Sequence, residues 1–199
     1  MAERRTGSPW TTKMSTASLV LIPAAIGINY VGKLFASMLK LPLWLDSIGT
    51  CLSACLAGPL VGALSGFLTN LIYGLTMDPI STVYGLTQAG IGIVVGLMAW
   101  YGRVNKAPGI LLTGLLAGLT AICISTPLNM IFWGGSTGNV WGDAVFAAMG
   151  SQGFLASAVD ELIVDLPDKI VVLFITAGIY KVLPRSLVSL YQAKDESLD

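Results

Sequence analysis

Apolar residues form six runs along the chain, separated by short segments rich in Gly, Pro, Asn and charged residues. The first run exceeds the roughly 20 residues that a helix needs to cross a bilayer. The second run is short and ends at Gly58. Because proline is tolerated in the first turn of a helix, a third helix is predicted to begin at Pro59. The pattern predicts an all-α integral membrane protein with six transmembrane helices, the second of them short: 14–39, 47–57, 59–75, 81–101, 109–133 and 156–183.

The segments between these runs are too polar or too short to cross a membrane. Residues 41–46 read as an amphipathic connector, residues 134–142 as a glycine-rich loop, and residues 143–150 as a short extra helix. The sequence therefore predicts one membrane domain with two flanking polar segments: a cytoplasmic N-terminal segment 1–13, a six-helix domain 14–184 and a cytoplasmic polar tail 185–199.

The distribution of basic residues predicts the orientation, since cytoplasmic loops carry an excess of Lys and Arg. With six spans, one side of the membrane receives Arg4, Arg5, Lys13, Arg103, Lys106, Lys181, Arg185 and Lys194. The other side receives Lys40 together with Asp46, Asp78 and Asp143. Both termini are therefore expected to be cytoplasmic.

Composition agrees with a membrane protein and excludes several other classes. Among 199 residues, 54% are hydrophobic and 11% are charged, and the formal net charge is zero. Soluble domains carry roughly 25% charged residues. The absence of net positive charge argues against nucleic-acid binding. The chain has no histidine and shows no phosphate-binding loop or nucleophile–base pair. We therefore expect no enzymatic activity and no cofactor.

The three cysteines, Cys51, Cys55 and Cys123, lie in apolar runs. They are interpreted as small buried side chains, because no further Cys or His completes a metal site. Glycines spaced four residues apart, as in Gly62/Gly66 and Gly92/Gly96, are typical of helices whose backbones approach closely.

Polar side chains within the runs gather toward the outer ends, if the orientation above is correct. Ionisable groups in a bilayer are costly and usually face a cavity or one another. The sequence therefore predicts a binding cavity near the outer face, among Asn70, Gln88, Asn129, Asp160, Glu161, Asp165, Asp168 and Lys169. Asn29 lies nearer the middle of the first run.

Simpler interpretations remain for these residues. Asp165 and Lys169 are one helical turn apart and would pair with each other. Asn70 and Asn129 would serve as hydrogen-bonding contacts between helices. Tryptophans near a membrane surface often form an aromatic belt. Alternatively, three tryptophans beside Asn139 would form a lid over an aromatic ligand: Trp44, Trp133 and Trp141.

Three stretches resemble the substrate-binding S components of energy-coupling-factor (ECF) transporters. Residues 43–50 read Leu-Trp-Leu-Asp-Ser-Ile-Gly-Thr, and residues 57–66 read Ala-Gly-Pro-Leu-Val-Gly-Ala-Leu-Ser-Gly. Residues 161–170, Glu-Leu-Ile-Val-Asp-Leu-Pro-Asp-Lys-Ile, together with Tyr-Lys-Val-Leu-Pro at 180–184, resemble the last helix of the riboflavin-transporter-like branch. The resemblance covers residues 14–184, including the number of spans.

The resemblance implies a protein of a prokaryotic cell membrane that captures a vitamin or related compound from outside. It would dock on a transmembrane coupling subunit that carries two cytoplasmic ATPases. Ligand contacts in such proteins come from the connection after the first helix and from the outer halves of helices four to six. Those regions hold Trp44, Asp46, Tyr84, Gln88, Asn129, Trp133, Asn139, Asp165 and Lys169. Asn129 and Lys169 occupy positions where riboflavin binders have Asn and Lys.

The docking motif of the family is only partly present. Many S components carry an Ala-x-x-x-Ala pair on the first helix, which packs against the coupling subunit. At that spacing Ala25 is followed here by Asn29, whereas Gly32 and Ala36 keep the pattern nearer the outer end.

Three functions are compatible with the sequence. The first is capture of a vitamin-like compound, with riboflavin or a flavin-like compound as the leading substrate, for an ATP-driven importer. Four carboxylates against one lysine in the last run favour a cationic or amine-bearing ligand instead. The second function is a membrane sensor or scaffold that binds a ligand without transporting it. The third is a secondary transporter coupled to protons through Asp160, Glu161 or Asp165.

Overall fold

The computed structural model describes residues 8–10, 15–150 and 153–192. Over these residues the chain is entirely helical, with eight α-helices and two short 3-10 helices and no strand. The helices are α1 (Thr16–Met38), α2 (Ile48–Ala57), α3 (Pro59–Thr76), η1 (Pro79–Thr82), α4 (Gly85–Trp100), η2 (Arg103–Asn105), α5 (Ala107–Phe132), α6 (Val140–Ala148), α7 (Gly153–Val182) and α8 (Arg185–Gln192). The prediction of an all-α protein is confirmed.

Within the described part of the chain, three helices are long and apolar enough to cross a membrane: α1, α3 and α5. α2 and α4 are apolar but have only 10 and 16 residues. α7 has 30 residues, about 45 Å at 1.5 Å per residue, and carries several buried charges. The chain is thus a membrane protein by the length and composition of its helices.

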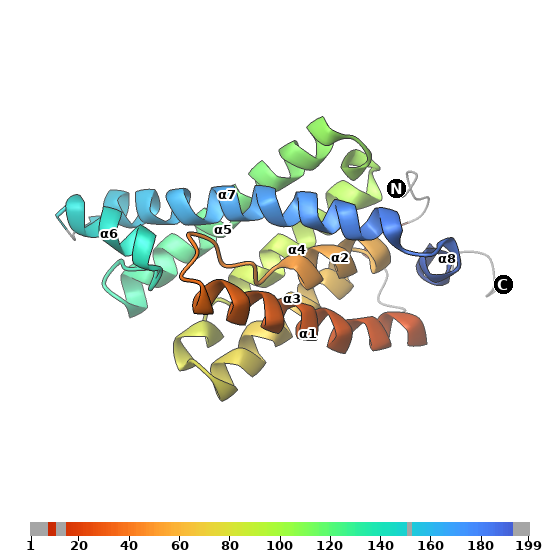
Figure 1. Ribbon diagram of the computed structural model, residues 1–199, viewed down its shortest axis with the longest axis horizontal. Helices are drawn as coiled ribbons and strands as arrows, with labels where there is room; N and C mark the ends of the chain where they lie inside the picture. The colour runs from red at the N-terminus through yellow and green to blue at the C-terminus, as the bar shows by residue number, and fades with distance from the viewer. Residues whose placement is uncertain (1–7, 11–14, 151–152, 193–199) are drawn as a thin grey trace.

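α7 runs along the longest axis of the molecule, with α6 beside its first turns and α8 beyond its end (Figure 1). α5 packs extensively against α7, and α3 packs extensively against α4. The short helix α2 lies in the centre, where it contacts α1, α3, α4 and α7. Its residues Gly49 through Leu56 are all buried. α8 contacts both α1 and α2, so the beginning and the end of the bundle lie together.

Glycines allow the closest helix contacts, as their spacing predicts. A side chain at Gly92 of α4 would meet the backbone of Gly62 and Ala63 in α3. On the other side of the bundle, a side chain at Gly114 of α5 would lie 2.9 Å from the Cα atom of Ile170 in α7. Gly58 joins α2 to α3 with a φ angle of 95°, a conformation that L side chains rarely adopt. One residue, Gly58, thus separates the end of α2 from the start of α3 at Pro59.

Within the segment expected as a polar tail, residues Arg185–Gln192 form the helix α8. Val188 and Tyr191 pack against the hydrophobic core, whereas Arg185, Ser186 and Ser189 are exposed. An eight-residue helix with so few apolar positions does not stand out as an apolar run. Parts of the two flanking segments fall outside the described residues, and these parts include Arg4, Arg5, Lys13 and Lys194.

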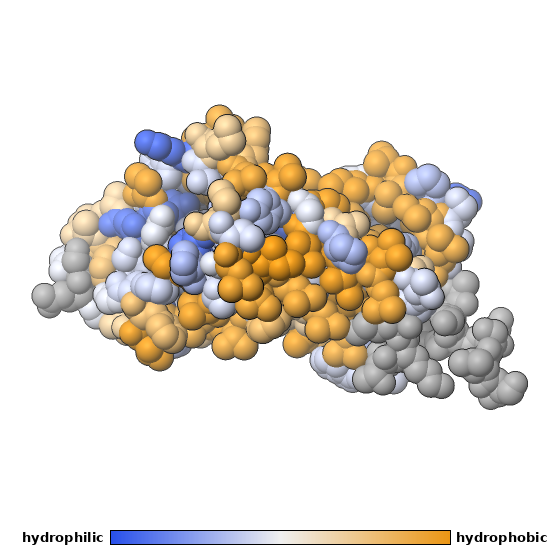
Figure 2. Space-filling view, turned by 90° about the horizontal axis from the view of Figure 1, so that it is seen from below, coloured by the Kyte–Doolittle hydropathy of each residue, from blue (hydrophilic) through white to orange (hydrophobic). Residues whose placement is uncertain are grey.

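The outer surface is largely apolar, and the interior holds many polar side chains. In Figure 2, apolar residues cover the middle of the visible face, whereas polar residues gather toward the left end. Large exposed apolar side chains occur on α1, α5 and α7: Leu19, Val20, Val31, Phe35, Leu111, Leu112, Leu119, Phe174 and Ile175. Buried polar side chains include Asn29, Asn70, Gln88, Asn129, Asp160 and Lys169. This distribution is expected for a protein surrounded by lipid, where an apolar surface carries no penalty.

Candidate functional site

Asn29 of α1 joins three helices at the centre of the bundle. Its Oδ1 atom accepts hydrogen bonds from the backbone N–H groups of Gly49 (2.7 Å) and Thr50 (3.2 Å), in the first turn of α2. Its Nδ2 group donates to the hydroxyl of Thr50 (2.8 Å) and to the hydroxyl of Thr69 in α3 (3.0 Å). These bonds satisfy donors at the start of α2 that have no partner within their own helix. Asn29 therefore positions α2 and the connection that precedes it.

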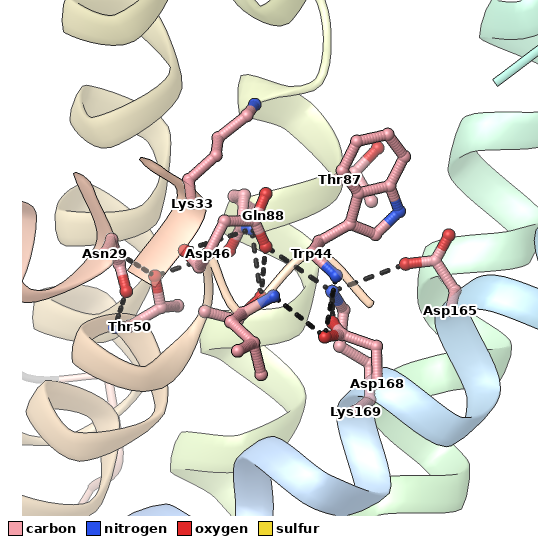
Figure 3. Close-up of polar contacts among 12 residues, drawn as sticks. Asn29, Lys33, Trp44, Asp46, Thr50, Thr87, Gln88, Asp165, Asp168 and Lys169 are labelled. Atoms are coloured by element: carbon pink, nitrogen blue, oxygen red, sulfur yellow. Dashed lines mark hydrogen bonds and ion pairs between the residues drawn. The ribbon is translucent and has the colours of Figure 1, made fainter. Parts of the chain in front are cut away.

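Lys169 of α7 is the centre of an ion-pair network that Figure 3 shows in close-up. Its side chain is 2% exposed, and its Nζ atom lies 2.6 Å from Asp168, 3.3 Å from Asp165 and 3.6 Å from Asp46. The pairing of Asp165 with Lys169, one of the two interpretations of this residue pair, is thus present in the structure. Three carboxylates around one ammonium leave excess negative charge within the network.

Asp46 brings a carboxylate into this network from the connection between α1 and α2. Burial alone would raise the pKa of the Asp46 carboxyl, but the charges of Lys169 and Lys33, together with hydrogen bonds from Ser47 and Gln88, hold this pKa below its usual value. The Gln88 side chain of α4 donates to the Asp46 carboxylate (2.8 Å) and to the Ser47 hydroxyl (3.0 Å). The connection is therefore attached to α4 as well as to α7.

Asp168 holds the same connection through backbone atoms. Its Oδ1 atom accepts hydrogen bonds from the backbone N–H groups of Trp44 (3.0 Å) and Leu45 (2.9 Å). Leu45 has a φ angle of 52°, so the chain turns sharply where it presents these N–H groups to α7. Sequence reasoning placed Asp168 in the polar cavity but did not select it as a binding residue. Its distance of 124 positions from Trp44 explains why the contact was missed.

A second polar cluster connects the start of α4 with α5 and α7. The Tyr84 hydroxyl donates to the Asn129 side chain, and the Asn129 amide donates to Glu161 at 2.5 Å. Thr87 and Ser125 share a hydrogen bond of 3.0 Å nearby. Asn129 thus links helices in this structure, as one of the two interpretations of this residue predicts.

A third set of bonds surrounds the glycine-rich loop and the start of α6. The Asp143 carboxylate accepts from the Ser136 hydroxyl (2.6 Å) and from backbone N–H groups of the loop, and the Thr137 hydroxyl donates to Asp160 (3.0 Å). Asn139 and Trp141 donate to backbone carbonyl groups of the connection after α1. Trp141 is 55% exposed, so it makes this contact at the surface of the molecule.

A cavity of about 270 Å³ opens beside this connection. Its walls come from the end of α1, the connection, α3, the start of η1 and the glycine-rich loop: Lys33, Ala36, Ser37, Lys40, Leu41, Leu43, Trp44, Tyr73, Asp78, Gly138, Asn139 and Val140. Of the residues that sequence reasoning selected for ligand binding, Trp44 and Asn139 line it. Of the remaining selected residues, Trp141 is exposed on the connection and Trp133 lies at the end of α5 beside Phe132, whereas the others lie in the polar clusters described above.

The cavity thus lies between α1, the connection, α3 and the glycine-rich loop, and it includes the connection from which the resemblance to S components implies ligand contacts, but no residue of α4, α5 or α7. Sequence reasoning did not select Lys33, Tyr73 or Asp78. The position of Lys33 within an apolar run could have indicated a polar site there, because a lysine in such a run requires a polar environment.

The residues proposed for partner docking lie inside the chain. Ala25 and Ala36 are buried, and a side chain added to Gly49 of α2 would meet the backbone of Ala25. Gly32 lies against the backbone of Leu45. Ala25 and Gly32 thus let α1 approach α2 and the connection, and Gly32 remains half-buried. Ala24 and Gly27 are small residues on the exposed side of α1.

The arrangement offers hydrogen bonds, charges and aromatic surfaces for binding. Over the described residues, no group of His, Cys, Asp and Glu is placed to hold a metal ion. No protein-family model, curated protein or solved structure matches this chain.

Proposed function

We propose that this protein captures a small vitamin-like molecule at the outer face of a prokaryotic cell membrane, as the substrate-binding subunit of an ATP-driven ECF importer. The observation that carries the proposal is the cavity bounded by a connection whose backbone is fixed to α7 and to the glycine-rich loop. Affinity in such a site arises from an enclosed apolar wall with a few placed polar groups. The resemblance to S components supports the same function.

In this proposal α1, α2, α3, α4, α5 and α7 are the six membrane crossings, with both termini in the cytoplasm. The contacts of α8 with α1 and α2 support an even number of crossings. The basic residues Arg103, Lys181 and Arg185 fall on the cytoplasmic side in this topology. The cavity then opens to the outside, beside Lys40 and Asp78.

The energy for transport comes from partners in this proposal, because the sequence has no phosphate-binding motif of its own. A transmembrane coupling subunit and two cytoplasmic ATPases would complete the importer. The lipid bilayer is the surrounding solvent for the apolar faces of α1, α5 and α7.

The test begins with the compound that the chain carries. The protein is extracted in detergent, purified, denatured and analysed by mass spectrometry for small molecules. We expect one compound at close to one molecule per chain, absent from an unrelated membrane protein purified in parallel. Trp44→Ala removes a cavity wall and is expected to lose the compound, whereas Trp10→Ala, at an exposed position, is expected to keep it.

Uptake of that compound then tests the coupling. We expect uptake into vesicles only when the coupling subunit, the ATPases and ATP are present. A bound compound with no uptake in their presence would contradict import and support a sensor. A chain that purifies empty and gains no thermal stability from any vitamin would contradict capture itself.

A second candidate, proton-coupled secondary transport, is supported by two buried carboxylates of α7. Neither Asp160 nor Glu161 takes part in the ion pairs of the described residues, and one Asp160 oxygen has no hydrogen-bond partner there. Uptake that stops with a protonophore and with Asp160→Asn, yet continues without ATP, would favour this candidate.

A further inference from the structure

Lys33 is a cation without a carboxylate partner among the described residues. All three ion pairs within 4.0 Å there are formed by Lys169. The Lys33 Nζ atom donates one hydrogen bond, to the Ser81 hydroxyl at 2.8 Å. An ammonium group has three donors. Lys33 therefore has donors to spare at the wall of the cavity.

Aromatic rings hold the Lys33 ammonium in place. It lies 4.3 Å from the ring centroid of Tyr73 and 5.9 Å from that of Trp44. Both distances are within the range of a cation–π interaction, which stabilises a cation without neutralising it. In Figure 3 the Lys33 amine points away from Asp46 and from the network around Lys169. Its charge is thus presented to the cavity.

The carboxylate of Asp78, which also lines the cavity, is occupied by other donors. One oxygen accepts from the backbone N–H group of Ile80 (3.2 Å), and the other accepts from the Ser81 hydroxyl (3.1 Å). Ser81 accordingly lies between Asp78 and Lys33. With Lys40 also in the wall, the cavity has two lysines against one aspartate. The balance of charge favours an anion.

The carboxylates of α7 do not reverse this balance. Asp165, Asp168 and Glu161 are absent from the cavity wall, and Lys169 contacts two of them. A cationic ligand in the cavity would meet Lys33 instead. Of the three carboxylates in the ion-pair network, Asp46 interacts electrostatically with Lys33, but none of the three lines the space that a ligand can occupy.

We propose that this cavity binds a compact organic anion, whose carboxylate or phosphate group contacts Lys33 and whose body packs against Trp44 and Tyr73. This inference rests on the proposed function and specifies its substrate class. The volume of 270 Å³ corresponds to about nine water molecules at roughly 30 Å³ each. Such a volume suits a compound of one ring or a short chain.

The experiment compares matched pairs of anionic and neutral compounds on the purified full chain in a non-ionic detergent. The pairs are nicotinate with nicotinamide, pantothenate with pantothenyl alcohol, and pyridoxal 5′-phosphate with pyridoxal. Dissociation constants are measured by equilibrium dialysis. We expect at least one anion to bind about tenfold tighter than its neutral partner.

Variants assign that preference to the cavity. Lys33→Met is expected to abolish the preference, whereas Lys33→Arg keeps the charge and most of the preference. Asp78→Asn removes the opposing charge and is expected to strengthen anion binding by about threefold or more. Lys106→Met, at an exposed position before α5, is the control and should change nothing. Strengthening by Asp78→Asn is a result that a purely structural contribution of Lys33 does not predict.

The proposal is overturned if no anion binds at millimolar concentration, if the neutral member binds equally well in every pair, or if Lys33→Met leaves the preference unchanged. It is also overturned if the compound retained through Lys33 is a phospholipid. A neutral or cationic compound found by mass analysis would overturn the anion site and leave capture intact. An empty chain would instead contradict the proposed function.

Discussion

Replacing Lys169 by methionine tests whether the ion-pair network stabilises the fold. The substitution keeps the length of the side chain and removes the charge that contacts three carboxylates at 2.6, 3.3 and 3.6 Å. At an effective dielectric constant of about 20, each contact corresponds to roughly 5 kcal/mol of attraction. The cost of removing these groups from water offsets most of it. Because the carboxylates remain buried without their cation, we expect the free energy of unfolding to fall by about 3–5 kcal/mol.

The assay is reversible unfolding in mixed micelles, followed by circular dichroism. Lys106→Met is the matched control and should stay within about 0.5 kcal/mol of the parent chain, since its side chain is exposed. Adding Asp168→Asn to Lys169→Met removes one of the three unpaired carboxylates, and should recover about 1 kcal/mol. A cost below about 1 kcal/mol for Lys169→Met, with no recovery in the double variant, would refute the reasoning.

Three further predictions follow from the helix contacts and the topology. Asn29→Leu removes four buried hydrogen bonds and is expected to lower the free energy of unfolding by about 3 kcal/mol in the same assay. Gly92→Ala places a methyl group against the backbone of α3 and should lower the free energy of unfolding by about 1–3 kcal/mol. Gly27→Ala places its methyl group in open space and should raise the free energy of unfolding by about 0.5–1 kcal/mol. Equal effects of the two substitutions would contradict the close approach of α3 and α4. A cysteine replacing Lys40 should react with a membrane-impermeant maleimide on intact cells, and one replacing Arg103 only after permeabilisation; labelling of both from outside would exclude the proposed orientation.

The helices could be predicted because each apolar run ends at a residue that breaks helices. The run expected at 59–75 is Pro59–Thr76 in the structure, and the run expected at 109–133 is Ala107–Phe132. The predicted start of the fourth helix, at residue 81, was less accurate. Pro79 and the Asp78 side chain, which caps Ile80, form a separate 3-10 helix there, and α4 begins at Gly85.

The candidate site could be predicted only in part. The concentration of carboxylates in the last run correctly indicated buried polar contacts around Lys169. The cavity itself depends on which face of α1 points inward, and a single lysine in an apolar run does not specify that face. Asp168 contacts the connection through the backbone N–H groups of Trp44 and Leu45, which are far away along the chain. A backbone N–H group does not depend on the identity of the side chain, so the sequence does not reveal this contact. Such contacts follow from the packed fold and leave no residue pattern.

The connection between α1 and α2 is held by its own main chain and by the buried Asp46 side chain, which does not line the cavity. Lys40 and Leu41 contribute carbonyl oxygens, and Trp44 and Leu45 contribute N–H groups. Attachment therefore does not depend on the side chains that this segment presents to the cavity. Evolution or an engineer could exchange Leu43 or Trp44 to suit a different ligand and keep the segment in its place. The protein separates the part that holds the segment in place from the part that selects the ligand, so a change of specificity here need not weaken the fold.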